Sequence, residues 1–288
     1  MQISDYRIDK ALNAIHRNIS GNLTAANLAR IAACSEQHFH RIFKASVGEC
    51  VHEYVRRTRL EQAANQLMFD RDKPVVEIAA LCGFSSLSSF SRVFKNQFGV
   101  PPGRWRTREE KSETAPWHSD AEIAAGYSRI RTFQLPRAQL VERAEQPVAY
   151  VRHQGYGRSI RKPWQTLQAW CLAENRSFRN QIGLHHSNPA WVNLDLCRYV
   201  ACVPITEPVV RRGPVSAMLL PGGLHAAFEL QGKYGELLPW LSRLQDEWLP
   251  DSGFTMRTTP AFVEYRKNHF LEQDDTFELT LFLPIGLY

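Results

Sequence analysis

Two pairs of basic side chains in the first third of the chain recur at the same spacing. Arg41 and Lys44 stand three residues apart, and Arg92 and Lys95 repeat that arrangement further along. An arginine can bind guanine O6 and N7 with two hydrogen bonds, or it can hold a backbone phosphate without reading sequence. These residues therefore point to contact with a nucleic acid, and the choice between the two roles stays open for both arginines.

Both pairs belong to segments whose apolar residues recur at helical spacing. Phe39 and Phe43 provide the apolar side of the first segment, and Phe90 and Phe94 that of the second. A short apolar segment and a turn precede each, so the pattern predicts two helix-turn-helix units. The side chains left to face the groove of double-stranded DNA are Glu36, Gln37, His40, Arg41 and Lys44 in the first unit and Leu87, Ser88, Ser91, Arg92 and Lys95 in the second.

The two units differ at the turn between their helices. Gly83 suits the second turn, because glycine adopts a left-handed backbone conformation without steric cost. The first unit has Ala33 at that place, so we expect its turn to stay right-handed. Thr24 and Ser35 are expected to cap the two helices of the first unit.

The positive charge of the chain lies in the same region. Residues 1–111 carry 17 Lys and Arg against 11 Asp and Glu, whereas residues 112–288 carry 18 of each kind, so the formal excess of +6 belongs to the first part. A basic surface favours phosphate but does not require it. A helix expected over about residues 50–69 adds a cationic cluster that could lie over phosphate, formed by Arg56, Arg57 and Arg59.

Composition limits the class of protein. The chain has 288 residues, of which 44% are hydrophobic and 22% charged, enough apolar material for about two globular domains. No leader-like segment and no run of about 18 apolar residues occurs, so we expect a cytoplasmic protein without a membrane segment. The six cysteines show neither C-x-x-C nor zinc-finger spacing. We expect reduced thiols, no metal and no cofactor.

The first part of the chain resembles the AraC/XylS family of transcription regulators over residues 5–108. The residues that carry the resemblance are Gly83–Ser86, Phe90–Lys95, Phe98–Pro102 and Trp105–Arg106. The resemblance implies an all-α DNA-binding domain with two helix-turn-helix units, a role in transcription, as an activator or as a repressor, and RNA polymerase as a further partner. Carried over by position, it places the groove-facing residues at Gln37, His40 and Arg41 and at Leu87, Ser88, Ser91 and Arg92.

The remainder of the chain contains a second internal repeat, after an expected linker over residues 109–126. The matching segments are Ala149–Gly157 with Ala226–Gly235, Pro163–Trp164 with Pro239–Trp240, Asn188–Val192 with Thr259–Val263, and Val203–Ile205 with Leu283–Ile285. Each copy is predicted to form strand, helix, strand, strand. Two such units can bury their apolar strand faces side by side, which predicts an α+β domain over residues 127–288 with a cleft along the seam.

This half resembles the GyrI-like effector-binding domains, most specifically at Asn188–Pro189 and Cys197–Ile205. In that family a glutamate in an aromatic cleft can attract cationic, lipophilic ligands, and the corresponding residue here is Glu264, with Asn193 at the equivalent place of the first copy. A buried carboxylate beside aromatic rings favours a cation. The candidate ligand-binding residues are Glu264, Tyr156, Trp164, Trp191, Trp240 and Phe262.

Alternatives remain at this level. Glu264 could instead face solvent or pair with Arg266. The leading hypothesis is a DNA-binding regulator that responds to a small, lipophilic cation, and the second is a DNA-binding regulator whose C-terminal domain docks a protein without a small ligand. A hydrolase-like cleft is the third. Because no Gly-x-Ser-x-Gly, P-loop or metal-ligand motif occurs, we expect neither catalytic residues nor enzymatic activity.

Overall fold

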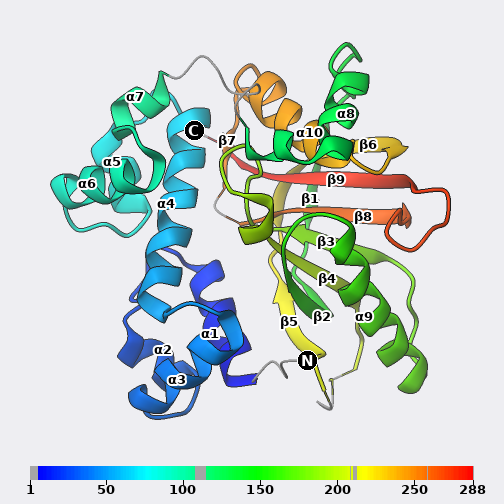
Figure 1. Ribbon diagram of the computed structural model, residues 1–288, viewed down its shortest axis with the longest axis horizontal. Helices are drawn as coiled ribbons and strands as arrows, with labels where there is room; N and C mark the ends of the chain where they lie inside the picture. The colour runs from blue at the N-terminus through cyan, green and yellow to red at the C-terminus, as the bar shows by residue number, and fades with distance from the viewer. Residues whose placement is uncertain (1–5, 108–114, 208, 210–212, 258, 288) are drawn as a thin grey trace. The chain divides into compact units, whose positions relative to one another are not determined.

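The computed structural model describes residues 6–107, 115–207, 209, 213–257 and 259–287. The chain divides into two compact units, Met1–Glu109 and Glu110–Tyr288. Each unit is described by itself below. The fold class predicted from the sequence is confirmed: the first unit is helical, and the second combines an antiparallel sheet with helices (Figure 1).

The first unit contains two helix-turn-helix units connected by one long helix. The helices are α1 (Tyr6–Arg17), α2 (Ala25–Ile31), α3 (Glu36–Val47), α4 (Val51–Phe69), α5 (Val75–Leu81), α6 (Leu87–Phe98) and α7 (Pro102–Arg106). The pairs α2–α3 and α5–α6 form the two units, and α4 is the connecting helix (Figure 1). The expected caps are confirmed, since Thr24 accepts a hydrogen bond from the amide of Asn27 and Ser35 from that of His38. At α6 the cap is Ser86.

The turn of the first unit differs from its prediction. Ala33 has a φ of 52°, so the turn is left-handed like that at Gly83, whose φ is 79°. An alanine in this conformation brings its Cβ close to the backbone and costs about 1–2 kcal/mol. The reason is a Schellman motif at the end of each first helix: Ala33 and Gly83 donate to the carbonyls of Arg30 and Ala80, and the next residues, Cys34 and Phe84, donate to carbonyls five residues back, those of Ala29 and Ala79.

Aromatic side chains form the core of each helix-turn-helix unit. In the first, the rings of Phe39 and Phe43 lie 5.5 Å apart, and Phe43 contacts Tyr54 of α4 edge-on. In the second, an array of tilted rings runs from the turn before α6 to α7 and comprises Phe84, Phe90, Phe94, Phe98 and Trp105. The indole of Trp105 donates to the carbonyl of Ala64, which attaches α7 to α4. Both second helices are therefore held through their inner sides, which leaves their outer sides free to bear polar residues.

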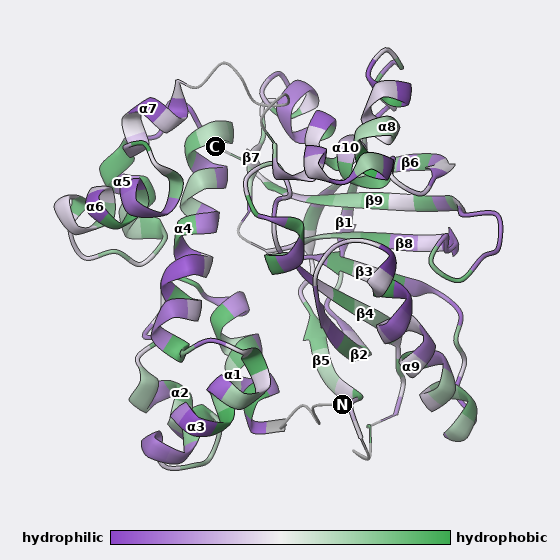
Figure 2. Cartoon of the chain, viewed as in Figure 1, coloured by the Kyte–Doolittle hydropathy of each residue, from purple (hydrophilic) through white to green (hydrophobic). Residues whose placement is uncertain are grey.

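The second unit contains one large antiparallel sheet. Its strands are β1 (Gln139–Arg143), β2 (Gln146–Gln154), β3 (Gln181–His185), β4 (Arg198–Pro204), β5 (Ser216–Leu220), β6 (Gly223–Lys233), β7 (Thr255–Met256), β8 (Ala261–Lys267) and β9 (Thr276–Gly286). The main helices are α8 (Ala121–Ile130), α9 (Arg161–Ala173) and α10 (Leu237–Arg243). The strand order is β1-β6-β9-β8-β3-β4-β2-β5, and β7 pairs with β9. Hydrophobic colour along β4 in Figure 2 marks a central strand buried on both faces.

The strand order reveals an exchange between the two repeats. The repeats form the triplets β2, β3, β4 and β6, β8, β9, which meet where β3 pairs with β8. In each repeat one further strand precedes the triplet and pairs with the edge of the other repeat, β1 with β6 and β5 with β2. Neither added strand was predicted from the repeat in the sequence. They tie the two repeats together beyond the central seam.

The register assigns each strand residue to one of two faces, because directly paired residues share a face. Phe262 pairs with Leu184 and Phe282, so these residues lie on one face, where a buried apolar cluster also includes Tyr150 and Val200. The alternate residues lie on the opposite face, which is covered by helices. Trp164 of α9 contacts Tyr199 and Tyr265 there, and Trp248 contacts Phe228. We call these the cluster face and the helix face.

Two details of the predicted organisation are corrected. Residues 115–126, expected to belong to a linker, contain a buried Trp117 and the start of α8, which packs against α10. The segment Asn188–Val192 follows β3 as a turn instead of matching β8, so Asn193 is not the counterpart of Glu264. The residue paired with Glu264 at the seam is Ile182. The similarity between Asn188-Pro189 and Thr259-Pro260 does not indicate equivalent positions in the two repeats. Proline is common in turns, and turns both precede and follow strands.

Candidate DNA-binding surface and effector site

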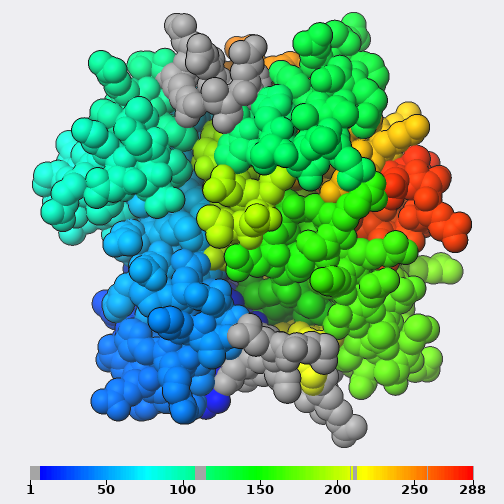
Figure 3. Space-filling model, in the orientation of Figure 1, coloured from blue at the N-terminus to red at the C-terminus, as the bar shows by residue number. Residues whose placement is uncertain are grey.

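The outer sides of α3 and α6 carry the side chains that the sequence analysis assigned to a DNA groove. Most are exposed, and His40 and Ser91 are half-buried. In the space-filling view, the two helix-turn-helix units form the blue and cyan surface (Figure 3). The exposed members are Glu36, Gln37, Arg41 and Lys44 on α3 and Leu87, Ser88, Arg92 and Lys95 on α6.

The two candidate arginines have different surroundings. Arg41 contacts the ring of His38 at 3.0 Å between Nη2 and Nδ1, and His40 lies 3.8 Å from the Glu36 carboxylate. Arg92 makes no ion pair among the residues that the structure describes. Both guanidinium groups stand on exposed residues. Neither is committed to a partner that would prevent contact with a base or a phosphate.

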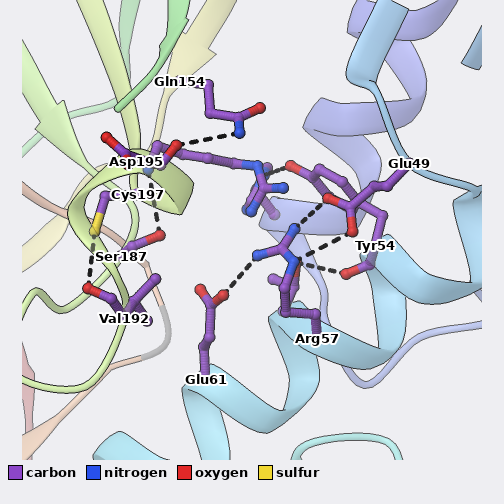
Figure 4. A network of polar contacts seen from close by, with 12 residues as sticks. Glu49, Tyr54, Arg57, Glu61, Gln154, Ser187, Val192, Asp195 and Cys197 are labelled. Atoms are coloured by element: carbon purple, nitrogen blue, oxygen red, sulfur yellow. Dashed lines mark hydrogen bonds and ion pairs between the residues drawn. The ribbon is translucent and has the colours of Figure 1, made fainter. Parts of the chain in front are cut away.

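The cationic cluster expected on α4 does not form a phosphate-binding surface. Arg57 is bound between two carboxylates, at 2.7 Å from Glu49 and 2.5 Å from Glu61, and its side chain is only 14% exposed (Figure 4). Arg59 donates to the carbonyls of Ile19 and Gly21. Both arginines therefore hold the unit together. Of the three arginines, only Arg56 is exposed.

The six candidate ligand-binding residues lie in separate parts of the second unit. Phe262 and Glu264 are on the cluster face, whereas Trp164 is buried on the helix face and donates to the Tyr199 hydroxyl at 3.1 Å. Trp240 on α10 lies under the guanidinium of Arg243. The two others are Tyr156, which lines a cavity on the helix face, and Trp191, which is half-buried after β3. A single aromatic cleft containing all six is not present.

Glu264 is already paired with a cation from its own chain. Its carboxylate lies 2.5 Å from Nη2 of Arg143 on β1. The same guanidinium lies over two rings, 4.6 Å from the centroid of Phe282 and 5.3 Å from that of Phe262, and these rings stack 4.7 Å apart. The alternative pairing with Arg266 is wrong, because Arg266 binds Glu229 instead. Carboxylate and aromatic faces thus form a cation site that Arg143 occupies.

The helix face holds the other polar groups of interest. Tyr199 and Tyr265 have hydroxyls 3.4 Å apart, and burial raises the pKa of both. Close to them, a small cavity is lined by residues of both repeats and by Ile123 of α8. Its polar lining consists of two tyrosines, Tyr156 and Tyr234, and two histidines, His185 and His269. Tyr156 is one of the six candidate ligand contacts named from the sequence, whereas neither histidine is.

Arg143 and the two cavity histidines were missed as site residues for a physical reason. Arg143 lies on a strand that pairs with the other repeat, so its approach to Glu264 depends on a pairing between segments far apart in the chain. His185 ends β3, and His269 follows β8. The separation of Glu264 from its neighbour Tyr265 could have been predicted, because successive residues of a strand point to opposite faces of the sheet.

The described residues show neither a metal site nor a membrane helix. No group of three or more His, Cys, Asp or Glu side chains among them could hold a metal ion. None of the six cysteines forms a disulfide, and burial raises the pKa of Cys82 to about 12. Within the described part of the chain, no helix combines the length and apolar character needed to cross a membrane.

Comparison with known proteins assigns both units. A helix-turn-helix domain model matches residues 28–108, and a model described as the GyrI-like small molecule binding domain matches residues 138–285. LumQ, a probable transcriptional regulator of Photobacterium leiognathi, is 38% identical over 94 residues, which cover 33% of this chain and 38% of that protein. PqrA, a probable transcription factor of Proteus vulgaris, is 37% identical over 87 residues, which cover 30% of this chain and 70% of PqrA.

These likenesses cover different lengths. The matched region spans 38% of the length of LumQ. It spans 34% of the length of each of two further relatives, YbfP of Bacillus subtilis and an AraC-like transcription regulator of Streptomyces lividans. A cryo-EM structure of an EcmrR–DNA complex aligns with 92% of this chain and 99% of that chain, at 12% identity and a TM-score of 0.46. The chain thus joins an AraC-type helix-turn-helix domain of transcriptional regulators to a small-molecule-binding domain, and it belongs to the GyrI-like small molecule binding domain family.

Proposed function

We propose that this protein regulates transcription by binding double-stranded DNA through α3 and α6, and that a small molecule bound by its second unit changes its affinity for DNA. The observation that carries the DNA-binding part is the repeated geometry of the two helices. Each buries a pair of phenylalanines and exposes an arginine and a lysine at matching positions. Two such helices on one chain can enter two stretches of major groove.

The groove contacts are assigned to the ten residues named from the sequence. Arg41 and Arg92 are the candidates for base or phosphate contact, and Lys44 and Lys95 for phosphate. Exposure of both arginines supports this assignment. As an activator the protein would also contact RNA polymerase, and a pull-down of polymerase by the DNA-bound protein tests that partner.

The regulatory part requires a ligand that distinguishes two states of the protein, since equal affinity for both states shifts nothing. The direct test is the affinity of the full chain for a DNA duplex selected from a random pool, measured while lipophilic cations, anions and neutral compounds are added. A change of fivefold or more with one class supports regulation, which corresponds to about 1 kcal/mol of coupling. No change with any class favours the alternative, a protein-docking module.

A lipophilic cation is the first ligand class to examine, because the site around Glu264 is built for positive charge. Such a ligand must displace the Arg143 guanidinium from Glu264 and from the stacked rings of Phe282 and Phe262. We therefore expect weak binding of tetraphenylphosphonium to the unaltered protein. Arg143→Ala should bind it at least tenfold more tightly, and adding Glu264→Gln should remove the gain.

Arg266→Ala is the matched control for that experiment. It breaks an ion pair with Glu229 on a neighbouring strand, where both side chains are more than half exposed. Tetraphenylphosphonium affinity should stay unchanged in this variant. Equal affinity of the unaltered protein and Arg143→Ala would exclude a cation site at Glu264 while leaving DNA binding untouched.

A further inference from the structure

A small cavity on the helix face lies where the two repeats meet α8. Its volume is about 30 Å³. Tyr156 and His185 come from the first repeat, Tyr234 and His269 from the second, and Ile123 from α8. Contributions from three segments make this a single site that neither repeat contains alone.

The two histidines present buried polar atoms without a partner. His185 is 5% exposed and His269 is 4% exposed. Both nitrogens of His185 and Nδ1 of His269 lack a hydrogen-bond partner among the described residues. Buried polar atoms are nearly always satisfied, because leaving them unpaired is costly, so such atoms around a cavity indicate a missing partner.

The surroundings favour uncharged imidazoles. Burial lowers the pKa of His185 to about 4 and that of His269 to about 3. Aromatic rings lie against both, Tyr156 edge-on at 5.3 Å from His185 and Phe270 at 4.0 Å from His269. A neutral imidazole offers one donor and one acceptor.

The lining contains no carboxylate. Its residues are apolar, aromatic or glycine apart from the tyrosines and histidines. The nearest charged groups form their own pairs: Arg158 binds Glu122 at 2.6 Å and Asp275 at 3.0 Å. A cation placed here would have no counter-charge, so this cavity differs from the Glu264 site in the ligand it can accept.

We propose that His185 and His269 bind the hydroxyl group of an uncharged aromatic ligand, a phenol, which acts as an effector of the second unit at a site separate from that around Glu264. This inference rests on the proposed function, since it names the chemical class of the effector. A hydroxyl both donates and accepts, and it therefore complements a pair of neutral imidazoles. The aromatic lining suits the ring of the same ligand.

Entry of a ring requires one wall of the cavity to move. A volume of about 30 Å³ is near that of one water molecule, well below the several hundred Å³ of an ordinary ligand pocket. The wall formed by α8 rests on the turn at Tyr234–Gly235 with backbone against backbone, because a Cβ on Gly126 would lie 2.1 Å from the Gly235 carbonyl oxygen. Arg158 stacks on Tyr234 at 4.1 Å and binds Glu122 of α8.

The test uses the full chain with phenol as probe, toluene as a ring without a hydroxyl, and benzyltrimethylammonium as a cation. Binding is measured by calorimetry and by the ¹⁵N shifts of the imidazoles. We expect phenol to bind at least tenfold more tightly than either control and to shift the signals of His185 and His269. His185→Asn and His269→Asn should each weaken phenol binding at least tenfold, while His153→Asn, outside the cavity, leaves it unchanged.

Several results would overturn the phenol site. Unchanged imidazole signals at saturating phenol would mean that the cavity holds a resident water only. Equal binding of phenol and toluene would remove the histidines from recognition, and unaltered affinity in both asparagine variants would do the same. If those variants do not fold, the imidazole signals of the unaltered protein still decide. Regulation of DNA affinity by another compound would then leave the proposed function standing, whereas phenol binding without any effect on DNA would overturn regulation by this ligand alone.

Discussion

The two internal duplications of this chain serve different ends. The helix-turn-helix duplication yields two separate surfaces, each with its own arginine and lysine on an exposed helix side. The duplication in the second unit yields one shared interior, where His185 from one repeat and His269 from the other line the same cavity. The two helix-turn-helix copies therefore provide two similar surfaces, whereas the two repeats of the second unit together form a cavity that neither repeat has alone.

The largest expected effect concerns the separate surfaces. Replacing both Arg41 and Arg92 with Ala should weaken binding to a selected duplex by about 100-fold or more, since each guanidinium contact contributes about 1–3 kcal/mol. Because the arginines lie on different helices, the two losses should add. The affinities of the single and double variants at several salt concentrations check this, and phosphate contacts would also flatten the salt dependence.

Arg137→Ala provides a control from the second unit, where the side chain is exposed. It should leave DNA affinity within twofold. Strong non-additivity of Arg41→Ala and Arg92→Ala would contradict two independent reading surfaces, and unchanged affinity in the double variant would remove α3 and α6 from the interface.

The second prediction concerns the shared interior. Because burial lowers the pKa of His185 and His269 to about 4 and 3, the unfolded chain takes up protons near pH 6.5 while the folded chain does not. Stability should therefore fall as the pH decreases from about 6.5 toward 4, by on the order of 3 kcal/mol at most for each histidine. Chemical denaturation at a series of pH values measures this slope.

The groups facing these imidazoles are the tyrosines Tyr156, Tyr199, Tyr234 and Tyr265, together with the paired Arg158 and Asp275. His185→Asn and His269→Asn should each flatten the slope, and because the residues share one cavity, their effects on stability should not add. The exposed His52→Asn should leave the slope as it is. An unchanged slope in both cavity variants would place the pH dependence elsewhere.

The smallest effect concerns the turns of the two helix-turn-helix units, which share a left-handed backbone conformation but contain different residues, Ala33 in one and Gly83 in the other. Ala33→Gly should stabilise the protein by about 0.5–1 kcal/mol, because glycine removes the steric cost of the left-handed turn and loses part of the gain to chain entropy. Gly83→Ala should destabilise it by about 1–2 kcal/mol, since its new Cβ would also lie 2.7 Å from the Arg59 guanidinium. Urea denaturation of both variants would contradict this account if the two changes had the same sign.

Residue positions that depend on local periodicity were predictable from the sequence. The exposed and buried sides of α3 and α6 follow from the helical spacing of Phe39 and Phe43 and of Phe90 and Phe94. The role of Arg57 was not predictable in this way, because it depends on ion pairs with Glu49 and Glu61. A charged side chain identifies a surface only when no counter-charge lies within reach.

In the second unit, several features could not be predicted from the sequence. The fold class and the central repeat were predictable from matching segments, but the exchanged strands β1 and β5 were not, since nothing local specifies a partner strand in the other repeat. The pairing of Arg143 with Glu264 depends on that exchange. The cavity depends on the seam between β3 and β8. Sites formed by distant segments emerge only once the sheet order is known.

The most direct test of this account is the DNA affinity of the full chain as a function of phenol concentration, compared between the unaltered protein and the His185→Asn/His269→Asn double variant. The account predicts a severalfold change in the unaltered protein that saturates with phenol and is absent from the variant. A flat curve in the unaltered protein, or the same curve in both proteins, would contradict it.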